Sequence, residues 1–441
     1  MKRFLLFSVL CVSLFSCSKE TEPISAVSDD LKLSKSRYLI SQDSIRRIAM
    51  ELPAMFEDNH QTRTSPLKQV AEITPLSRMA RKMQTKGSDN NLAWMNDIYV
   101  VDYTNQSGFA IISADTRLDL ILAYSDKGSF DESADIPGLA GLVSNIPDYA
   151  KLRLADWDSL IDPNPPGSEY YVDRSSVVNT QTTNQGPFIT TKWGQLEPFS
   201  KYTDGPLYGP TIAVVQLMAY YNCPPAITNL NSSTITYFNW PLDKGYVFGP
   251  ILEMYPESVE RVARAAEKVC QRLFVSLPQM TDGGSLTTTE VKNILPEFDY
   301  DIDGVQNYSL SAIYADLNKN RPVIMTGFNK SSATVGITEA SGWIVDGYQN
   351  TNITYQHDRV WYNGLGVELR REDRGRSTET RQLLHCNWGW DGRGDGYFTP
   401  GLFAPQQAQS YDFPTLTTPD HRNYRFAVTQ CTNIRPIYLP K

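Results

Sequence analysis

The segment Tyr208–Pro225, YGPTIAVVQLMAYYNCPP, has the pattern of a helix that is apolar on nearly every side. A helix of this kind is buried in a protein core. It opens with Gly209-Pro210, and this pair starts a helix well, because glycine is an acceptable N-cap and proline suits the first helical position. The segment therefore predicts a core helix whose first turn carries no reactive side chain.

The composition around this helix is that of an ordinary globular protein. The chain has 441 residues, of which 41% are hydrophobic and 20% are charged, so there is room for two or three domains with a sizeable core. The formal net charge is -8 and no block of Lys or Arg stands out. Nucleic acid is not an expected partner, since its recognition requires a basic surface.

The first residues have the pattern of a secretory signal. Lys2-Arg3 precede an apolar run, residues 4–15, that ends at Ser16-Cys17. Residues 14–17, LFSC, resemble a bacterial lipobox, which implies cleavage before Cys17 and attachment of a lipid to it. We expect a signal peptide over 1–17, a polar tether over 18–36, and an exported chain held to the bacterial cell envelope or surface by this anchor. The alternative is a plain signal peptide with an incidental cysteine.

The remaining cysteines do not form a metal-binding pattern. They are widely spaced and contain no C-x-x-C pair, so no metal and no cofactor is expected. Two disulfides with three possible pairings are one alternative, and burial as free thiols is the other. The four residues are Cys223, Cys270, Cys386 and Cys431.

Two domains are expected on either side of a turn-rich stretch. The first, 37–161, contains a helical pattern over 43–56 that Pro53 should interrupt. Three strands follow it, over 97–103, 108–114 and 119–125, the first two joined as a hairpin. Residues 162–186 contain three prolines and little periodicity, which predicts a linker.

The second domain, 187–441, places helices first and strands afterwards. This order is typical of the α+β class, with an antiparallel sheet. After the helix that opens at Gly209, further helices are expected over 257–274 and 285–298, and strands over 321–328, 342–349, 359–366, 383–390 and 394–400.

Three stretches of this domain, taken in their order, resemble the streptopain family of bacterial cysteine peptidases. They are TTKWGQLEPFS (190–200), GWIVDGYQ (342–349) and HCNWGWDGRGDGYF (385–398). Residues 96–131 are similar to the family's propeptide, which also occurs as a stand-alone inhibitor. The resemblance implies a papain-like α+β fold preceded by a small α+β propeptide-like domain.

Three of the family's functional positions are kept. The resemblance implies that the side-chain amide of Gln195 helps to form the oxyanion hole, a role that can lower a reaction barrier by about 3 kcal/mol. It also implies that Asn387 and Trp388 occupy the positions that orient and shield the catalytic histidine.

The nucleophile of the family is absent. Its Gly-Cys-Val-Ala run leads, seven residues after the cysteine, to a Gln-Ile/Leu-Met sequence that Gln216-Leu217-Met218 matches. Counting back seven residues from Gln216 gives Gly209. No cysteine lies between Cys17 and Cys223, so a small shift of the alignment does not supply one.

The catalytic base is absent as well. The family's Gly-His-Ala-Trp becomes Ala340-Ser341-Gly342-Trp343, so Ser341 stands where the imidazole should be. His357 and His385 are out of register. Without a nucleophile the covalent route is lost, and without a base even a thiol would stay largely protonated. We therefore predict an inactive homologue, a pseudopeptidase.

The five positions Gly209, Ser341, Gln195, Asn387 and Trp388 are expected to converge on one cleft. A papain-like dyad must lie within hydrogen-bond reach, so the Cα atoms of Gly209 and Ser341 should lie within about 10 Å of each other.

Two short motifs favour ordinary structural roles. Arg393-Gly394-Asp395 spells an integrin-binding tripeptide, but a turn is required there. Residues 299–304, DYDIDG, begin like a calcium loop, but the twelfth position is Leu310 where a bidentate Glu is needed.

Three functions are consistent with the sequence. The first is a pseudopeptidase that binds a peptide or protein in its cleft or regulates a partner such as an active peptidase of the same family. The second is an active cysteine endopeptidase zymogen. The third is a structural or adhesive surface lipoprotein.

Overall fold

The computed structural model describes residues 39–56, 68–78, 94–133, 136–157, 170–230, 232–244, 256–275, 287–329, 339–362, 368–403 and 428–438. The chain divides into two units, Met1–Leu39 and Ile40–Lys441, and the description below concerns the second. The signal peptide, the tether and Cys17 lie outside the described residues and stay predictions.

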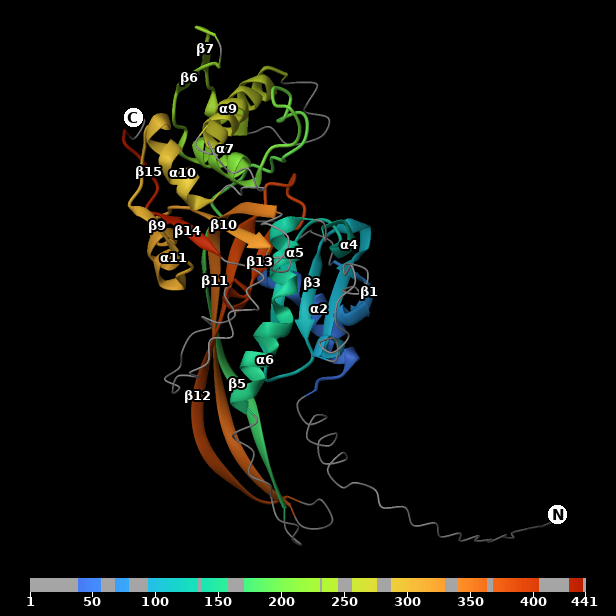
Figure 1. Cartoon of the computed structure of the whole chain (residues 1–441). Coiled ribbons are helices and arrows are strands. Elements are labelled where there is room, and N and C mark those ends of the chain that lie inside the picture. Colours follow the sequence, from blue (N-terminus) through green and yellow to red (C-terminus); the bar gives the residue numbers. More distant parts are fainter. Residues whose placement is uncertain are drawn as a thin grey trace, which may run out of the picture. The chain divides into compact units, whose positions relative to one another are not determined.

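The N-terminal part, up to residue 157, combines helices with a four-stranded antiparallel sheet (Figure 1). The expected strands and the hairpin between the first two are confirmed. The strands are β1 (Val70–Pro75), β2 (Ile98–Tyr103), β3 (Phe109–Ser113) and β4 (Ile121–Ser125). The helices are α2 (Gln42–Phe56), α4 (Phe130–Ser133), α5 (Pro137–Ser144) and α6 (Ile146–Trp157), with 3-10 turns η2 (Trp94–Asp97) and η3 (Thr104–Gln106).

The expectation that Pro53 interrupts the first helix is wrong, because α2 continues to Phe56. A proline removes the N–H that would bond to the carbonyl four residues earlier, which here belongs to Ala49. The hydroxyl of Tyr103 on β2 donates to that carbonyl at 2.7 Å in a buried site. The hydrogen bond that Pro53 removes within the helix is thus replaced by one from the sheet.

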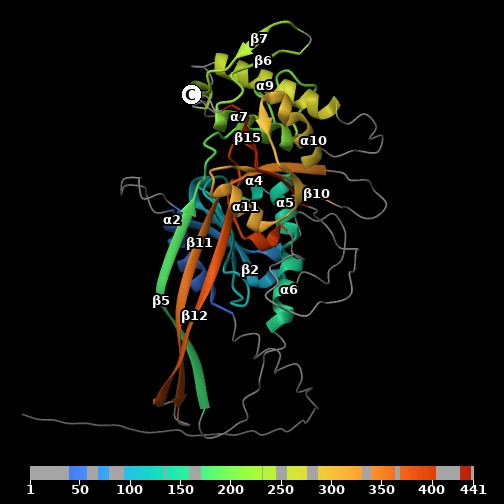
Figure 2. The ribbon, with the colours of Figure 1, turned by 90° about the vertical axis from the view of Figure 1, so that its left-hand side faces the viewer.

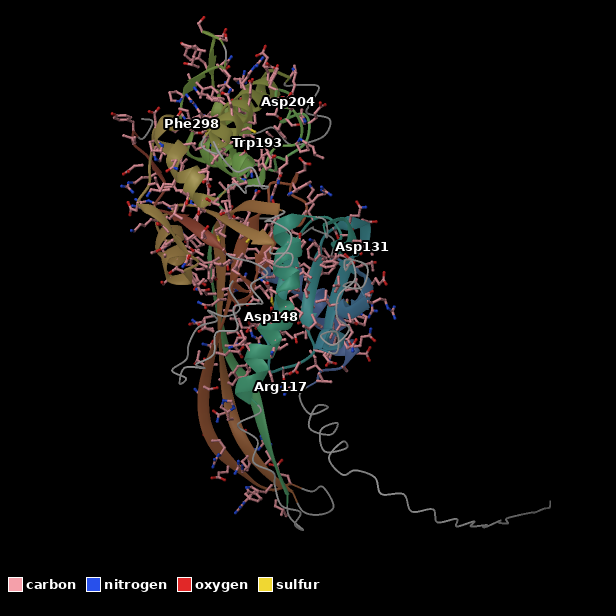
Figure 3. The ribbon with its side chains drawn as sticks, in the orientation of Figure 1. Arg117, Asp131, Asp148, Trp193, Asp204 and Phe298 are labelled. Atoms are coloured by element: carbon pink, nitrogen blue, oxygen red, sulfur yellow. The ribbon has the colours of Figure 1, made fainter. Side chains whose placement is uncertain are left out.

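The C-terminal part opens with helices around the segment that starts at Gly209. That helix, α7 (Gly209–Tyr221), is buried from Gly209 to Ala219 and ends at Asn222 in the left-handed conformation. It lies in a cluster with Trp193 and Phe298, which Figure 3 labels. The other helices are α8 (Trp240–Lys244), α9 (Pro256–Val275), α10 (Thr288–Ile294) and α11 (Leu310–Leu317), with 3-10 turns η5 (Leu295–Phe298) and η6 (Pro400–Leu402).

One antiparallel sheet connects both parts, in the order β1-β2-β3-β4-β13-β12-β11-β10-β14-β9. The expected α+β class is confirmed. Its further strands are β9 (Gly304–Asn307), β10 (Val323–Asn329), β11 (Glu339–Tyr362), β12 (Glu368–Asn387), β13 (Gly396–Phe398) and β14 (Thr429–Thr432). Two small pairs complete the topology: β6 (Ala226–Thr228) with β7 (Ile235–Tyr237), and β8 (Tyr300–Asp301) with β15 (Arg435–Pro436).

A long three-stranded ribbon corrects two expectations. Residues 170–185, placed in the linker 162–186, form strand β5 (Tyr170–Gln185), which pairs with β11. Residues 359–362, expected to begin a separate strand, are the end of β11. Figure 2 shows β5, β11 and β12 side by side in this ribbon. The local sequence gave no such signal, because the partner that satisfies the β5 backbone lies far along the chain. The domain boundary itself stays a prediction.

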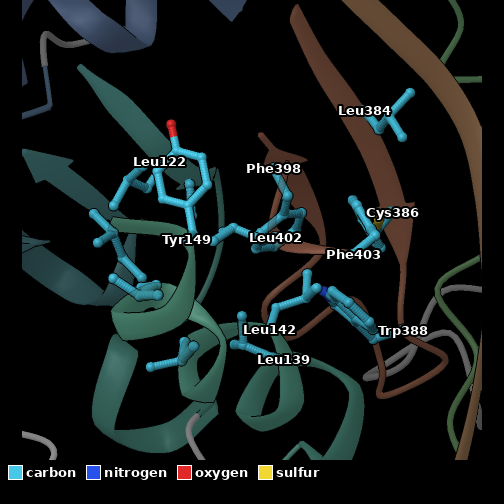
Figure 4. Packing of buried hydrophobic residues seen from close by; sticks show 14 of the residues in the cluster. Leu122, Leu139, Leu142, Tyr149, Leu384, Cys386, Trp388, Phe398, Leu402 and Phe403 are labelled. Atoms are coloured by element: carbon cyan, nitrogen blue, oxygen red, sulfur yellow. The ribbon is translucent and has the colours of Figure 1, made fainter. Parts of the chain in front are cut away.

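The two parts share a hydrophobic core as well as a sheet. β4 pairs with β13 through Ser125–Gly396, Tyr124–Tyr397 and Ala123–Phe398. Leu139 and Leu142 of α5 belong to the same buried cluster as Trp388 and Phe403, and Figure 4 shows these side chains facing one another. Asn145 also donates to the Leu402 carbonyl at 2.8 Å. We therefore expect the two parts to unfold together.

Leu142→Ala tests this expectation. Leu142 is fully buried in the shared cluster, so its truncation should lower the free energy of unfolding by about 3 kcal/mol. Urea unfolding should show one transition in which probes of both parts move together. Leu369, which is 48% exposed, supplies the control Leu369→Ala with little change expected. Two transitions, of which only the first responds to Leu142→Ala, would contradict the shared core.

Candidate active site

The positions expected for the nucleophile and the base are brought together at the start of α7. Ser341 lies near the start of β11, opposite Gly327 of β10, and Gly342 follows it. A Cβ atom added to Gly209 would lie 2.5 Å from the carbonyl oxygen and 2.6 Å from the nitrogen of Gly342. The backbone of Gly209 is therefore packed directly against the residue that follows Ser341. The side chain of Ser341 is outside the described part.

The contact is equally close in the other direction. A Cβ added to Gly342 would lie 2.6 Å from the Cδ and Cγ atoms of Pro210. Such distances are too short for any real Cβ, and the atoms around Gly209 are backbone atoms that cannot rotate away. Gly209, Pro210 and Gly342 thus fit one another, and they leave no room at residue 209 for a thiol-bearing side chain.

Gln195 lies beside the chain that enters α7. Its carbonyl accepts a hydrogen bond from the Leu207 N–H at 2.7 Å, two residues before Gly209. The residue is buried, with 9% of its surface exposed. Its side-chain amide makes no hydrogen bond to another described residue. Its oxyanion role stays a prediction.

Asn387 is used to join α7 to the sheet. Its Oδ1 accepts from Gln216 Nε2 at 2.9 Å, and its Nδ2 donates to the Thr191 carbonyl at 3.1 Å. Thr191 Oγ1 in turn donates to Gln216 Oε1 at 2.9 Å. Gln216 lies seven residues, about two helical turns, from Gly209. A buried amide that is fully bonded costs little, so this network fixes how α7 packs on β12.

Trp388 is also held in place by hydrogen bonds and by packing of its ring. It is 1% exposed, its Nε1 donates to the Gly394 carbonyl at 3.0 Å, and its ring lies 5.3 Å from that of Trp343. Its N–H donates to Asp395 Oδ1 at 2.8 Å. The side chain of Trp388 is therefore part of the core, and its shielding role stays a prediction.

His385, which is out of register with the expected catalytic base, is buried and has a defined partner. His385 Nδ1 lies 2.6 Å from Asp346 Oδ1, and Asp346 Oδ2 accepts from the Ile189 N–H at 2.7 Å. Asp346 is four residues from Gly342 along β11, which corresponds to about 13 Å. His385 therefore ties two strands and the segment before α7 together at a distance from Gly209. A nearby aspartate on the opposite strand was the one signal that could have revealed it.

The cysteines settle the choice between disulfides and thiols. Cys223, Cys270, Cys386 and Cys431 are all free and buried. Burial raises the pKa of the thiols of Cys223 and Cys270 to about 11, and it raises the pKa of Cys386 and Cys431 as well. A catalytic thiol requires a lowered pKa, so none of these four residues has the environment of a nucleophile.

The two short motifs have structural partners. Asp395 of the Arg-Gly-Asp sequence is fully buried, and its carboxylate forms an ion pair with Lys192 at 3.1 Å. Arg435 pairs with Asp301 and Asp303 of the acidic cluster. In the described ranges no group of three or more His, Cys, Asp or Glu residues could hold a metal ion. No helix described is long and apolar enough to cross a membrane.

The chain is similar to known proteins along both of its parts. Residues 193–398 match the model of the peptidase C10 family, and residues 47–149 match that of the Spi protease inhibitor. The streptopains of Streptococcus pyogenes and of its serotype M1 are each 22% identical over 330 residues, which cover 70% of this chain and 75% of theirs. A structure of a cysteine-to-alanine mutant of a Prevotella intermedia prointerpain A fragment is 18% identical, with a TM-score of 0.46 over 85% of this chain and 100% of that one.

The two matched ranges together define a peptidase-like domain behind an inhibitor-like propeptide domain. The predicted resemblance to the streptopain family is confirmed, and so is the predicted papain-like fold with its propeptide-like domain.

The close contact at the start of α7 predicts that the stability of the protein is sensitive to a larger side chain at position 342. Gly342→Ala should lower the free energy of unfolding by about 1–3 kcal/mol, because its Cβ would overlap the ring of Pro210. Gly304→Ala is the matched control, since nothing lies within 4 Å of its added Cβ. Urea unfolding of both variants provides the comparison. Equal tolerance of the two substitutions would show that the contact at Gly342 is loose.

Proposed function

We propose that this chain is a catalytically inactive member of the streptopain family that acts by binding. The observation that carries the proposal is the packing of Gly209 against Gly342, where the family requires a thiolate beside an imidazole. The raised pKa of the four described thiols supports it, because none of these cysteines has the lowered pKa that a replacement nucleophile would need.

The ligand we propose is a peptide or protein, such as an active peptidase of the same family. The N-terminal part matches an inhibitor model, but strand β4 is already paired with β13 of the same chain. Ser125 Oγ donates to the Asp395 carbonyl at 2.7 Å and Lys127 Nζ to that of Asp391 at 2.8 Å. Because these contacts occupy β4 within the chain, binding by the peptidase-like domain is favoured over inhibition in trans.

Activity measurements test the proposal against the zymogen alternative. The purified chain should not cleave casein, and an epoxysuccinyl inhibitor should not label it. The thiols of Cys223 and Cys270 should also react slowly with a maleimide from mildly acidic to mildly alkaline pH, because a raised pKa keeps them protonated there. Peptide mapping of the labelled protein, with the unfolded chain as the positive control, provides the measurement.

Maturation gives a second readout. An active zymogen would cut itself within 162–186, whereas this chain should stay full-length when free of other proteases. Residues 170–185 are paired with β11 and are not an unpaired substrate strand. Concentration-dependent cutting there, or labelling lost on replacing one native cysteine, would overturn the proposal.

We further propose that the chain is exported and lipid-anchored at Cys17. The basis is the sequence LFSC at the end of the apolar run. In a bacterial host, Cys17→Ala should abolish incorporation of labelled palmitate and release the protein from the membrane fraction. Cys11→Ala, within the apolar run, should leave both unchanged. Incorporation that persists in Cys17→Ala would exclude this anchor.

A further inference from the structure

The ribbon formed by β5, β11 and β12 has two outer edges of opposite character. β5 pairs only with β11 in the described part of the chain. β12 pairs with β13 only from residue 384 onward, and β11 pairs with β10 only over residues 339–345. Both edges therefore present unpaired backbone groups along the ribbon. An unpaired strand edge is a template for another strand unless charges or irregularities prevent pairing.

The β12 edge has the character of a protected edge. Residues 368–381 contain five arginines and four acidic residues, and every residue of 368–380 is exposed. Charged side chains on an edge strand oppose its pairing with another strand. This edge therefore has a built-in barrier to association.

The β5 edge lacks that protection. Residues 175–185, SSVVNTQTTNQ, carry no charge, and residues 176–184 are exposed. The register with β11 shifts at Val178, which leaves a regular run from Asn179 onward. Val177 and Val178, 57% and 46% exposed, lie at the end of this run. An uncharged, regular and exposed edge of this length is suited to strand addition.

We propose that the β5 edge pairs with the β5 edge of a second copy of this chain. A twofold axis that passes at Gln181 and is perpendicular to the sheet makes the two β5 strands antiparallel. The same face of each ribbon then lies on the same side of the joined sheet. Gln181 then lies opposite its own counterpart, Thr180 opposite Thr182, and Asn179 opposite Thr183.

The side chains favour an identical partner. Two identical strands place like charges close together wherever they carry a charge, and the run 179–183 carries none. Each of its pairs would join hydroxyl or amide groups, as the neighbouring strands already do: Thr182 Oγ1 lies 3.2 Å from Thr351 Oγ1. The product is a six-stranded ribbon whose new outer edges are the charged β12 edges, so association stops at the dimer.

Sedimentation of the purified full chain at increasing concentration tests the dimer. The chain should show a reversible monomer–dimer equilibrium. Gln181→Lys sets two ammonium groups against each other at the twofold axis and should weaken association at least about tenfold. Thr380→Lys is the matched control, because Thr380 and Gln181 lie opposite the same residue, Asn352, on the two sides of β11. It should leave the dimer unchanged.

Cross-linking of two cysteine variants tests the same dimer without the lysine variants, which could fold poorly. A short bis-maleimide should join two copies of Gln181→Cys and should not join two copies of Thr380→Cys. A wild-type chain that is monomeric at all concentrations would overturn the proposal and leave the edge to another protein. Dimerisation that Thr380→Lys disrupts and Gln181→Lys does not would also overturn it.

Discussion

The structure depends on the pairing of β4 with β13. Only three residue pairs make this contact, yet it turns two separate sheets into one. It requires glycine at position 396, where a Cβ would lie 2.0 Å from the Tyr124 carbonyl oxygen. Around it, α6 packs on η6, and the aromatic rings of Phe56 and Tyr397 stack with centroids 4.6 Å apart. An inhibitor-like domain that completes the sheet in this way is part of the fold.

The start of α7 is also set by close packing. A cysteine–histidine dyad needs open space between helix and strand, because both side chains must meet a substrate there. In this chain Gly209 and Pro210 close that space against Gly342, while the amide network of Gln216 and Asn387 holds the rest of the helix against the sheet. The helix is therefore held to the sheet by interactions about two turns away from Gly209, the position expected for the nucleophile.

Sequence alone predicted the elements that rest on local patterns. The core helix at Gly209 and the strands of the N-terminal sheet follow from apolar periodicity. The loss of the dyad, inferred from the spacing to Gln216 and from Ser341, stays a prediction. Sequence alone did not predict β5, whose partner is far along the chain, or the passage of α2 through Pro53, which depends on the hydroxyl of Tyr103. The hydrogen bonds of Asn387 were also out of reach, because a motif gives a residue's type and not its partners.

Native-state hydrogen exchange can show whether the inhibitor-like domain is a permanent part of the fold. The backbone amides that hydrogen-bond between β4 and β13 should exchange as slowly as those of β10 and β11. All four strands belong to one sheet, and β4 and β13 share a core with β10 and β11. Rapid exchange of β4 and β13 while β10 and β11 remain protected would mean that the N-terminal domain detaches by itself and is not a permanent part of the fold.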